Sequence, residues 1–174
     1  MMPMTPRRLL ILVTTVTAVM TLTGCVPEPA PTPTPTGFAS EEEAFAAAEE
    51  TYRAYIDATN ARNAGKKSDP TSYLMGEALD SDREVRQLLK ETGRSFEGKF
   101  VITGFKPVEA QQIDAATSLS AVVCMDSSDV LVVDEDGNDV TPEGDIAVYA
   151  LSVEFTAVDD ELRISQSESS SETC

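Results

Sequence analysis

The stretch AVYALSVEFTA, residues 147–157, places an apolar side chain at every second position. Successive side chains of a β-strand point to opposite faces, so this period of two gathers the apolar ones on one face. The pattern predicts a strand with one face buried in a core. Asp159-Asp160 predicts the turn that follows it, and Leu162 and Ile164 mark a last strand.

The residues upstream of this strand repeat the same period. FVITGF at 100–105 predicts a strand that is bulged at Pro107 and resumes over residues 108–113. Residues 119–125 alternate again and predict another strand. Cys124 lies on the opposite face from the apolar residues of that strand.

Residues 130–133 predict a short strand that leads into DEDGN at 134–138. The Asp-Gly step in this stretch is a strong hairpin signal. Asp134, Asp136 and Asn138 also imitate the start of a calcium loop, but aspartate stands where the loop needs its glycine. We therefore expect a solvated turn here and no metal or cofactor.

The sequence upstream of the strands has the helical period. SEEE at 40–43 is a capping box, and the helix that it begins is expected to run to about Asn63, with Gly65 as its stop. One face of this helix gathers Phe45, Ala48, Tyr52, Tyr55, Ile56 and Thr59.

A second helical zone is predicted after Asp69-Pro70, with a break near Gly76 and an end at Gly93. Its expected buried side consists of Leu79, Val85, Leu88 and Leu89.

Two helices followed by antiparallel strands predict an α+β fold, with the N-terminal helices packed on one face of a curved sheet. The final ten residues, SQSESSSETC, are polar up to the last cysteine. We expect them to form a solvated tail.

The N-terminus has the pattern of an export signal. Arg7 and Arg8 precede an uncharged apolar run, Leu9 to Leu22, of 14 residues. A membrane-spanning helix needs roughly 20 such residues, so the run is short for a permanent span. It ends in LTGC at 22–25, which resembles the bacterial lipobox. We predict a lipoprotein signal peptide over residues 1–24 and lipid on the thiol of Cys25; the alternative is an ordinary signal peptide that ends near a cysteine.

Proline occupies every second position from Pro27 to Pro35. Alternating proline favours an extended, semi-rigid spacer. We interpret residues 25–38 as the lipidated cysteine and its stalk, and residues 39–174 as a single α+β domain. A Pro-rich ligand for a partner domain is the other interpretation of the stalk.

The charge restricts the partners. The formal net charge is -17, and the first 24 residues hold two basic residues and no acidic one. Such a field repels phosphates, which excludes nucleic acid and argues against direct binding to anionic headgroups. We expect attachment to the extracytoplasmic face of the cell membrane through lipid on Cys25. The remaining partner is expected to be an envelope protein, a polymer or a hydrophobic ligand.

The cysteines and the missing histidine limit the chemistry. With Cys25 assigned to lipid, Cys124 and Cys174 remain, and an even pair in an exported domain is typical of a disulfide. Two free thiols are the alternative. The absence of histidine removes the commonest general base near neutral pH and the commonest nitrogen ligand for metals.

Several stretches resemble one group of proteins. EEEAFAAAEETYRAYIDATNAR, DPTSYLMGEAL, FVITGF and CMDSSDVLVVDEDGNDVTP are similar to small actinobacterial lipoproteins of the nuclear transport factor 2-like superfamily. The resemblance covers most of residues 38–174 and implies a cone-shaped fold and an envelope location. It also implies a disulfide between a strand cysteine and one near the C-terminus, here Cys124 and Cys174.

The same resemblance implies a cavity between helix and sheet, which enzymes of this fold use for catalysis. The candidate residues here are Tyr52, Tyr55, Asp57, Tyr73 and Tyr149. Tyrosines at helical and strand spacing are usually core residues, so we expect a binding domain and no enzyme. The alternative is a pocket enzyme of the isomerase or dehydratase type that uses aspartate and tyrosine for proton transfer.

Overall fold

The structure is a computed structural model that describes residues 38–113, 116–144, 146–158 and 161–174. The expected signal peptide, the stalk up to residue 37, the lipidation of Cys25 and the turn at Asp159-Asp160 lie outside the described residues.

The described part of the chain contains two α-helices, a short 3-10 helix and a series of antiparallel strands. They follow one another as α1 (Glu41–Asn63), η1 (Pro70–Tyr73), α2 (Gly76–Glu91), β1 (Ser95–Glu97), β2 (Val101–Ile113), β3 (Ala116–Asp126), β4 (Leu131–Val133), β5 (Val148–Val158) and β6 (Glu161–Ser169). The predicted α+β class is confirmed.

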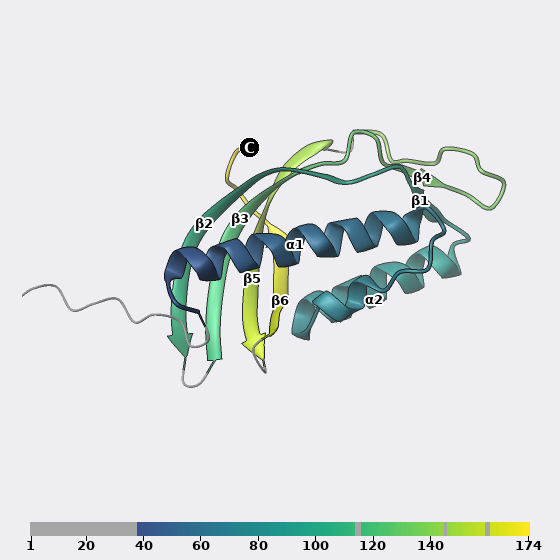
Figure 1. The fold of residues 1–174 in the computed structure, drawn as a ribbon. Helices are drawn as coiled ribbons and strands as arrows, with labels where there is room; N and C mark the ends of the chain where they lie inside the picture. Colours follow the sequence, from purple (N-terminus) through teal and green to yellow (C-terminus); the bar gives the residue numbers. More distant parts are fainter. Residues whose placement is uncertain (1–37, 114–115, 145, 159–160) are drawn as a thin grey trace, which may run out of the picture. The chain divides into compact units, whose positions relative to one another are not determined.

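Among the described strands, the long ones form one antiparallel sheet in the order β2-β3-β5-β6. Irregularities in register occur in β2 at Ile102/Gly104 and Pro107/Glu109, as expected for a bulge near Pro107. Because a bulge adds a residue to one strand only, it bends and twists the pair. Figure 1 shows β2 and β3 curving, with α1 lying across the strands.

Helix α1 supplies the apolar layer against the sheet. Ser40 Oγ accepts from the amide of Glu43 at 3.1 Å, as in a capping box. The Glu43 carboxylate reaches back to the amide of Ala39 at 2.8 Å, one residue before the N-cap Ser40. Gly65 ends the helix with φ of 72°, a conformation that glycine adopts without steric cost. The buried residues of the helix are Ala44, Phe45, Ala48, Tyr52, Ile56 and Thr59.

Helix α2 differs from the expectation. The predicted break falls at Leu74 and Met75, between η1 and the start of α2 at Gly76. The predicted buried side is wrong for Val85 and Leu88, which are 46% and 60% exposed. Leu79 is partly buried and packs against the core, and Leu89 is half-buried. Figure 1 shows α2 beside α1 at the β6 end of the sheet, and its one buried residue among those described is Ala78, near its start. In the C-terminal half of α2, Val85 and Leu88 therefore stay largely uncovered.

Two predictions about short strands need correction. The strand at 131–133 is confirmed, but it pairs with β1, which the sequence analysis missed, and the two form a separate small sheet. The solvated tail is wrong up to Ser169, because β6 continues that far and pairs with β5. A serine-rich edge strand can pair through its backbone while its hydroxyl side chains stay exposed. Such a strand has no alternation of apolar residues, so the sequence pattern does not predict it.

Candidate functional site

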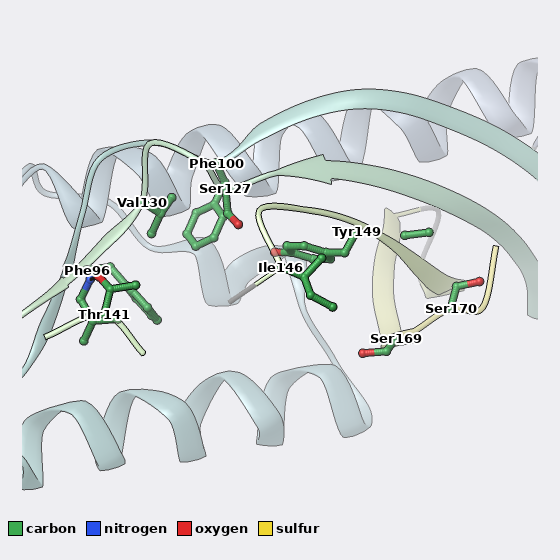
Figure 2. A pocket seen from close by; sticks show the side chains of 11 residues that line it. Phe96, Phe100, Ser127, Val130, Thr141, Ile146, Tyr149, Ser169 and Ser170 are labelled. Carbon is green, nitrogen blue, oxygen red and sulfur yellow. Dashed lines mark hydrogen bonds between the residues drawn. The ribbon is translucent and has the colours of Figure 1, made fainter. Parts of the chain in front are cut away.

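A groove lies where β1 and β4 approach the start of β5 and the end of β6. Its larger hollow, of about 440 Å³, has Phe96, Val132 and Ile146 among its apolar lining. Figure 2 shows Phe96, Val130 and Thr141 on one side of this hollow and Ser169 and Ser170 on the other, with Ile146 and Tyr149 between them.

A second hollow of about 240 Å³ shares Phe100 and Tyr149 with the first. Its lining adds Tyr52 and Tyr55 from α1 and Val85 from α2. We call the two hollows together the Tyr149 groove. Because Val85 and Ile146 are 46% and 67% exposed, the groove presents apolar side chains to solvent at both hollows.

The backbone of Phe100 is held by one side chain of α1. Asn60 Nδ2 donates to the Phe100 carbonyl at 2.9 Å, and Asn60 Oδ1 accepts from the Phe100 amide at 2.9 Å. The Phe100 ring meets the Phe96 ring edge-on, with 6.0 Å between centroids. This pair of hydrogen bonds positions the shared wall of the groove, and no motif in the sequence predicted this role of Asn60.

A carboxylate that the sequence analysis also missed closes the α2 side. Asp82 lines the smaller hollow, and its side chain is 10% exposed. Arg86 Nε lies 2.9 Å from Asp82 Oδ2, and Arg62 Nη2 lies 3.4 Å from Asp82 Oδ1. The two guanidinium groups compensate the charge and tie α1 to α2. An acidic residue one turn after Ala78 on an otherwise apolar helix face was the signal for this position.

The tyrosines of the smaller hollow are held in their neutral form. Burial raises the pKa of Tyr52 well above its ordinary value, and the neighbouring Tyr55 and Tyr149 add to the effect. Burial also raises the pKa of Tyr55, with a further contribution from the Asp82 carboxylate. Neutral hydroxyl groups can donate hydrogen bonds to a ligand, but they are poor general bases.

The structure brings three of the five predicted pocket residues together. Tyr52, Tyr55 and Tyr149 line the smaller hollow. Asp57 is exposed and lines neither hollow, and Tyr73 lies near Phe38 and Leu162 on another face of α1. The helical period explains the error for Asp57, since it is one residue past the buried Ile56 and so points away from the sheet.

The DEDGN turn forms as predicted, with the Asp134 amide donating to the Asn138 carbonyl at 3.0 Å and Gly137 at φ of 79°. The Asp134 carboxylate accepts from the amides of Asp136 and Asn138 at 3.0 and 2.8 Å. Hydrogen bonds from Asn138 lower the pKa of this carboxyl. Within the described residues, no group of three or more acidic or cysteine side chains is placed to hold a metal ion.

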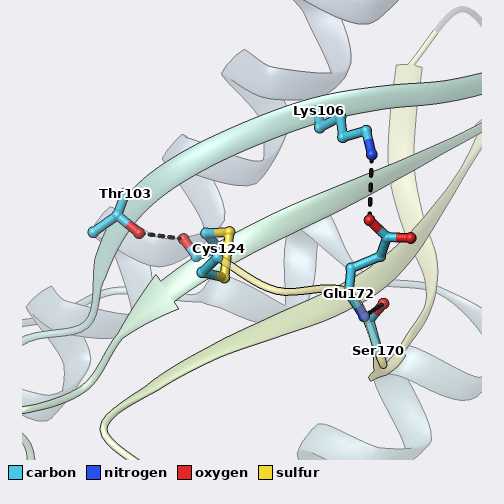
Figure 3. Close-up of a disulfide and its surroundings, with 6 residues drawn as sticks. Thr103, Lys106, Cys124, Ser170 and Glu172 are labelled. Carbon is cyan, nitrogen blue, oxygen red and sulfur yellow. Dashed lines mark hydrogen bonds and ion pairs between the residues drawn. A yellow bond between two sulfur atoms is a disulfide. The ribbon is translucent and has the colours of Figure 1, made fainter.

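The predicted pair Cys124 and Cys174 forms a disulfide, with 5.5 Å between Cα atoms. Figure 3 shows how it fastens the end of the chain beside β2, where Lys106 Nζ also meets Glu172 at 3.3 Å. The Ser170 amide donates to the Ala150 carbonyl at 2.9 Å. Because Ser170 lines the larger hollow, this strap of residues 170–174 supports one wall of the groove.

Comparisons with known proteins assign the chain to no family. No family model matches the chain, and no curated protein matches it. Among solved structures, the chain is similar to the intermembrane space region of the chloroplast protein ARC6, at a TM-score of 0.39 and 12% identity. The similarity covers 57% of this chain and 75% of that one. A likeness this weak carries no argument about fold or function. None of the helices in the described part is both long and apolar enough to cross a membrane.

Removing the disulfide should destabilise the domain. A closed loop with a sequence separation of 50 restricts the unfolded chain, which on the loop-entropy model is worth up to about 4 kcal/mol in the free energy of unfolding. We expect Cys124→Ser/Cys174→Ser to lose much of this in denaturant unfolding, whereas Cys25→Ser should not. Peptide maps that are identical with and without reductant would show that the bond does not form.

Stability should also fall in alkali. The pKa of Tyr52 and of Tyr55 is raised in the folded state, so their contribution is fully present below the unfolded value of 10.0 and is lost as the pH rises above it. Denaturant unfolding over this pH range should show a decline that is smaller in Tyr52→Phe. Tyr73→Phe, outside the groove, is the control for loss of a hydroxyl group. A wild-type curve that stays flat above about pH 10 would contradict this account.

Proposed function

We propose that this chain is a membrane-anchored lipoprotein whose α+β domain binds an apolar ligand or partner in the Tyr149 groove. The observation that carries the proposal is the groove itself, with its apolar and aromatic lining and its solvent-facing Val85 and Ile146. Exposed apolar residues around a hollow are typical of binding sites.

The anchor is proposed from the sequence. The basic and apolar N-terminus ends in LTGC, and the prolines after Cys25 would hold the domain away from the membrane. The disulfide between Cys124 and Cys174 supports an oxidising, extracytoplasmic location, because such bonds persist outside the cytosol.

Binding is favoured over catalysis by the state of the polar groups in the groove. Asp82 is paired with two arginines, and the raised pKa values of Tyr52 and Tyr55 disfavour tyrosinate. The alternative is an isomerase or dehydratase that uses an aspartate or tyrosine. Turnover of a substrate that Tyr149→Phe abolishes while the fold is kept would establish that alternative.

We also infer that the domain is a cone of the nuclear transport factor 2-like superfamily. Support comes from α1 lying across a curved antiparallel sheet and from the link between a strand cysteine and the C-terminus. The groove would then lie at the open end of the cone.

The anchor is tested by labelling cells with a fatty-acid probe. The wild-type chain should incorporate the label, and Cys25→Ser should remain unlabelled and unprocessed, because the thiol is the acceptor. Equal labelling of both chains would rule out lipid at Cys25.

The groove is tested with the neutral apolar dye Nile red on the compact unit Thr32–Cys174. The double variant Val85→Gln/Ile146→Gln should weaken dye binding by about tenfold, because it removes apolar contacts at both hollows. Val108→Gln/Val148→Gln is the matched control, since these residues are 59% and 49% exposed and line neither hollow. Equal binding by both double variants would place the dye elsewhere.

A further inference from the structure

Helix α2 extends from the Tyr149 groove, which Val85 lines, to an acidic cleft, which Glu91 lines. Val85 lines the smaller hollow, and Leu88 follows it three residues later, so the two lie on one helix face. The helix then ends at Glu91, which lines a separate hollow of about 400 Å³.

The opposite side of the groove shows the same succession. Val132 of β4 lines the larger hollow, and Asp134, two residues further, lines the acidic cleft together with Glu135 and Asp136. Both α2 and the segment that begins at β4 therefore run from the apolar groove to the acidic cleft. Lys90 and Arg94 adjoin this cleft in sequence but do not line it.

We propose that this combined surface docks a cationic amphipathic segment of a partner protein, with apolar side chains in the Tyr149 groove and Lys or Arg side chains at the Glu91–Asp136 cleft. The inference rests on the proposed binding function and names the partner class for that site. The exposed fractions of Val85 and Leu88, 46% and 60%, leave an apolar helix face for such a segment to cover.

The charge of the surface favours a basic segment over an acyl chain, a phospholipid or a second copy of the chain. An acyl chain would fill the apolar hollows but would gain nothing from the exposed carboxylates of the cleft. A phospholipid would also bring its phosphate toward a chain of net charge -17. A second copy of the same chain would bring that charge against itself. A basic segment satisfies both the apolar and the acidic parts of the surface.

The test uses the full chain in nanodiscs of neutral phosphatidylcholine, with empty discs as the blank. The probes are two dye-labelled peptides of 18 residues, one of leucine and lysine at helical amphipathic spacing and one with glutamate in place of every lysine. Fluorescence anisotropy should show the lysine peptide binding at least about tenfold more tightly. Its affinity should fall as the NaCl concentration rises from about 0.05 M to about 0.5 M.

Variants locate the contact. Leu88→Gln should weaken the lysine peptide severalfold, whereas Val108→Gln, at 59% exposure against 60% for Leu88, should not. Glu135→Gln/Asp136→Asn should weaken it and reduce its salt dependence. The control Glu109→Gln/Glu154→Gln removes the same charge from exposed positions on β2 and β5 and should leave binding unchanged.

Several outcomes would overturn the inference. Equal binding of the two peptides, or equal effects of the groove variants and their controls, would exclude a cationic segment at this surface. Binding of a fluorescent fatty acid but of neither peptide would keep the proposed apolar function and assign it to a lipid. Particles that contain two discs without added peptide would instead assign the surface to a second copy of the chain.

Discussion

The packing of the apolar face of α1 against the curved sheet is the interaction on which the other features of the domain depend. Tyr52 is 2% exposed and meets the Phe155 ring edge-on, with 6.4 Å between centroids. The ring of Phe105, on β2, also packs against the Phe155 ring, with 6.3 Å between centroids. Aromatic side chains bury large apolar areas and prefer such tilted contacts, so they hold the helix in one position across the strands.

That position sets the polar contacts at the end of α1. Asn60 reaches both the carbonyl and the amide of Phe100, 40 residues away in sequence, and Arg62 reaches Asp82 on α2. These groups are partly buried, where unpaired polar atoms cost stability, so the contacts fix the β1–β2 connection and α2 relative to the core. The groove lies in the space between the segments that they hold.

The wall on the other side depends on the end of the chain. The disulfide and the Ser170 hydrogen bond hold the last residues over Ala150, which is 4% exposed although it lies on the face of β5 opposite the main core. A covalent link suits this place because the strap consists of polar residues with little apolar area to bury. One wall of the groove is thus maintained by a bond that requires an oxidising environment.

The sequence alone determined the elements whose apolar residues repeat with a clear period. These include α1 with its capping box, the strand at residues 147–157, the bulge near Pro107 and the turn at DEDGN. It also predicted the pairing of Cys124 with Cys174, because the number and context of cysteines restrict the choice. The helix, the strand, the bulge and the turn are local features, which periodicity and turn residues reveal directly. The disulfide follows from the small number of cysteines.

Only the tertiary structure decided which apolar faces are covered. Val85 and Leu88 have the spacing of a buried helix face, yet they are exposed because the sheet ends before it reaches the second half of α2. Ser165 to Ser169 carry no apolar pattern, yet they form a strand because β5 supplies a backbone partner. The roles of Asn60 and Asp82 likewise come from partners distant in sequence. Whether a face is buried, and whether a strand is paired, depends on the segment that packs beside it. The sequence pattern shows which face of an element is apolar, but it does not show which segment lies next to that face.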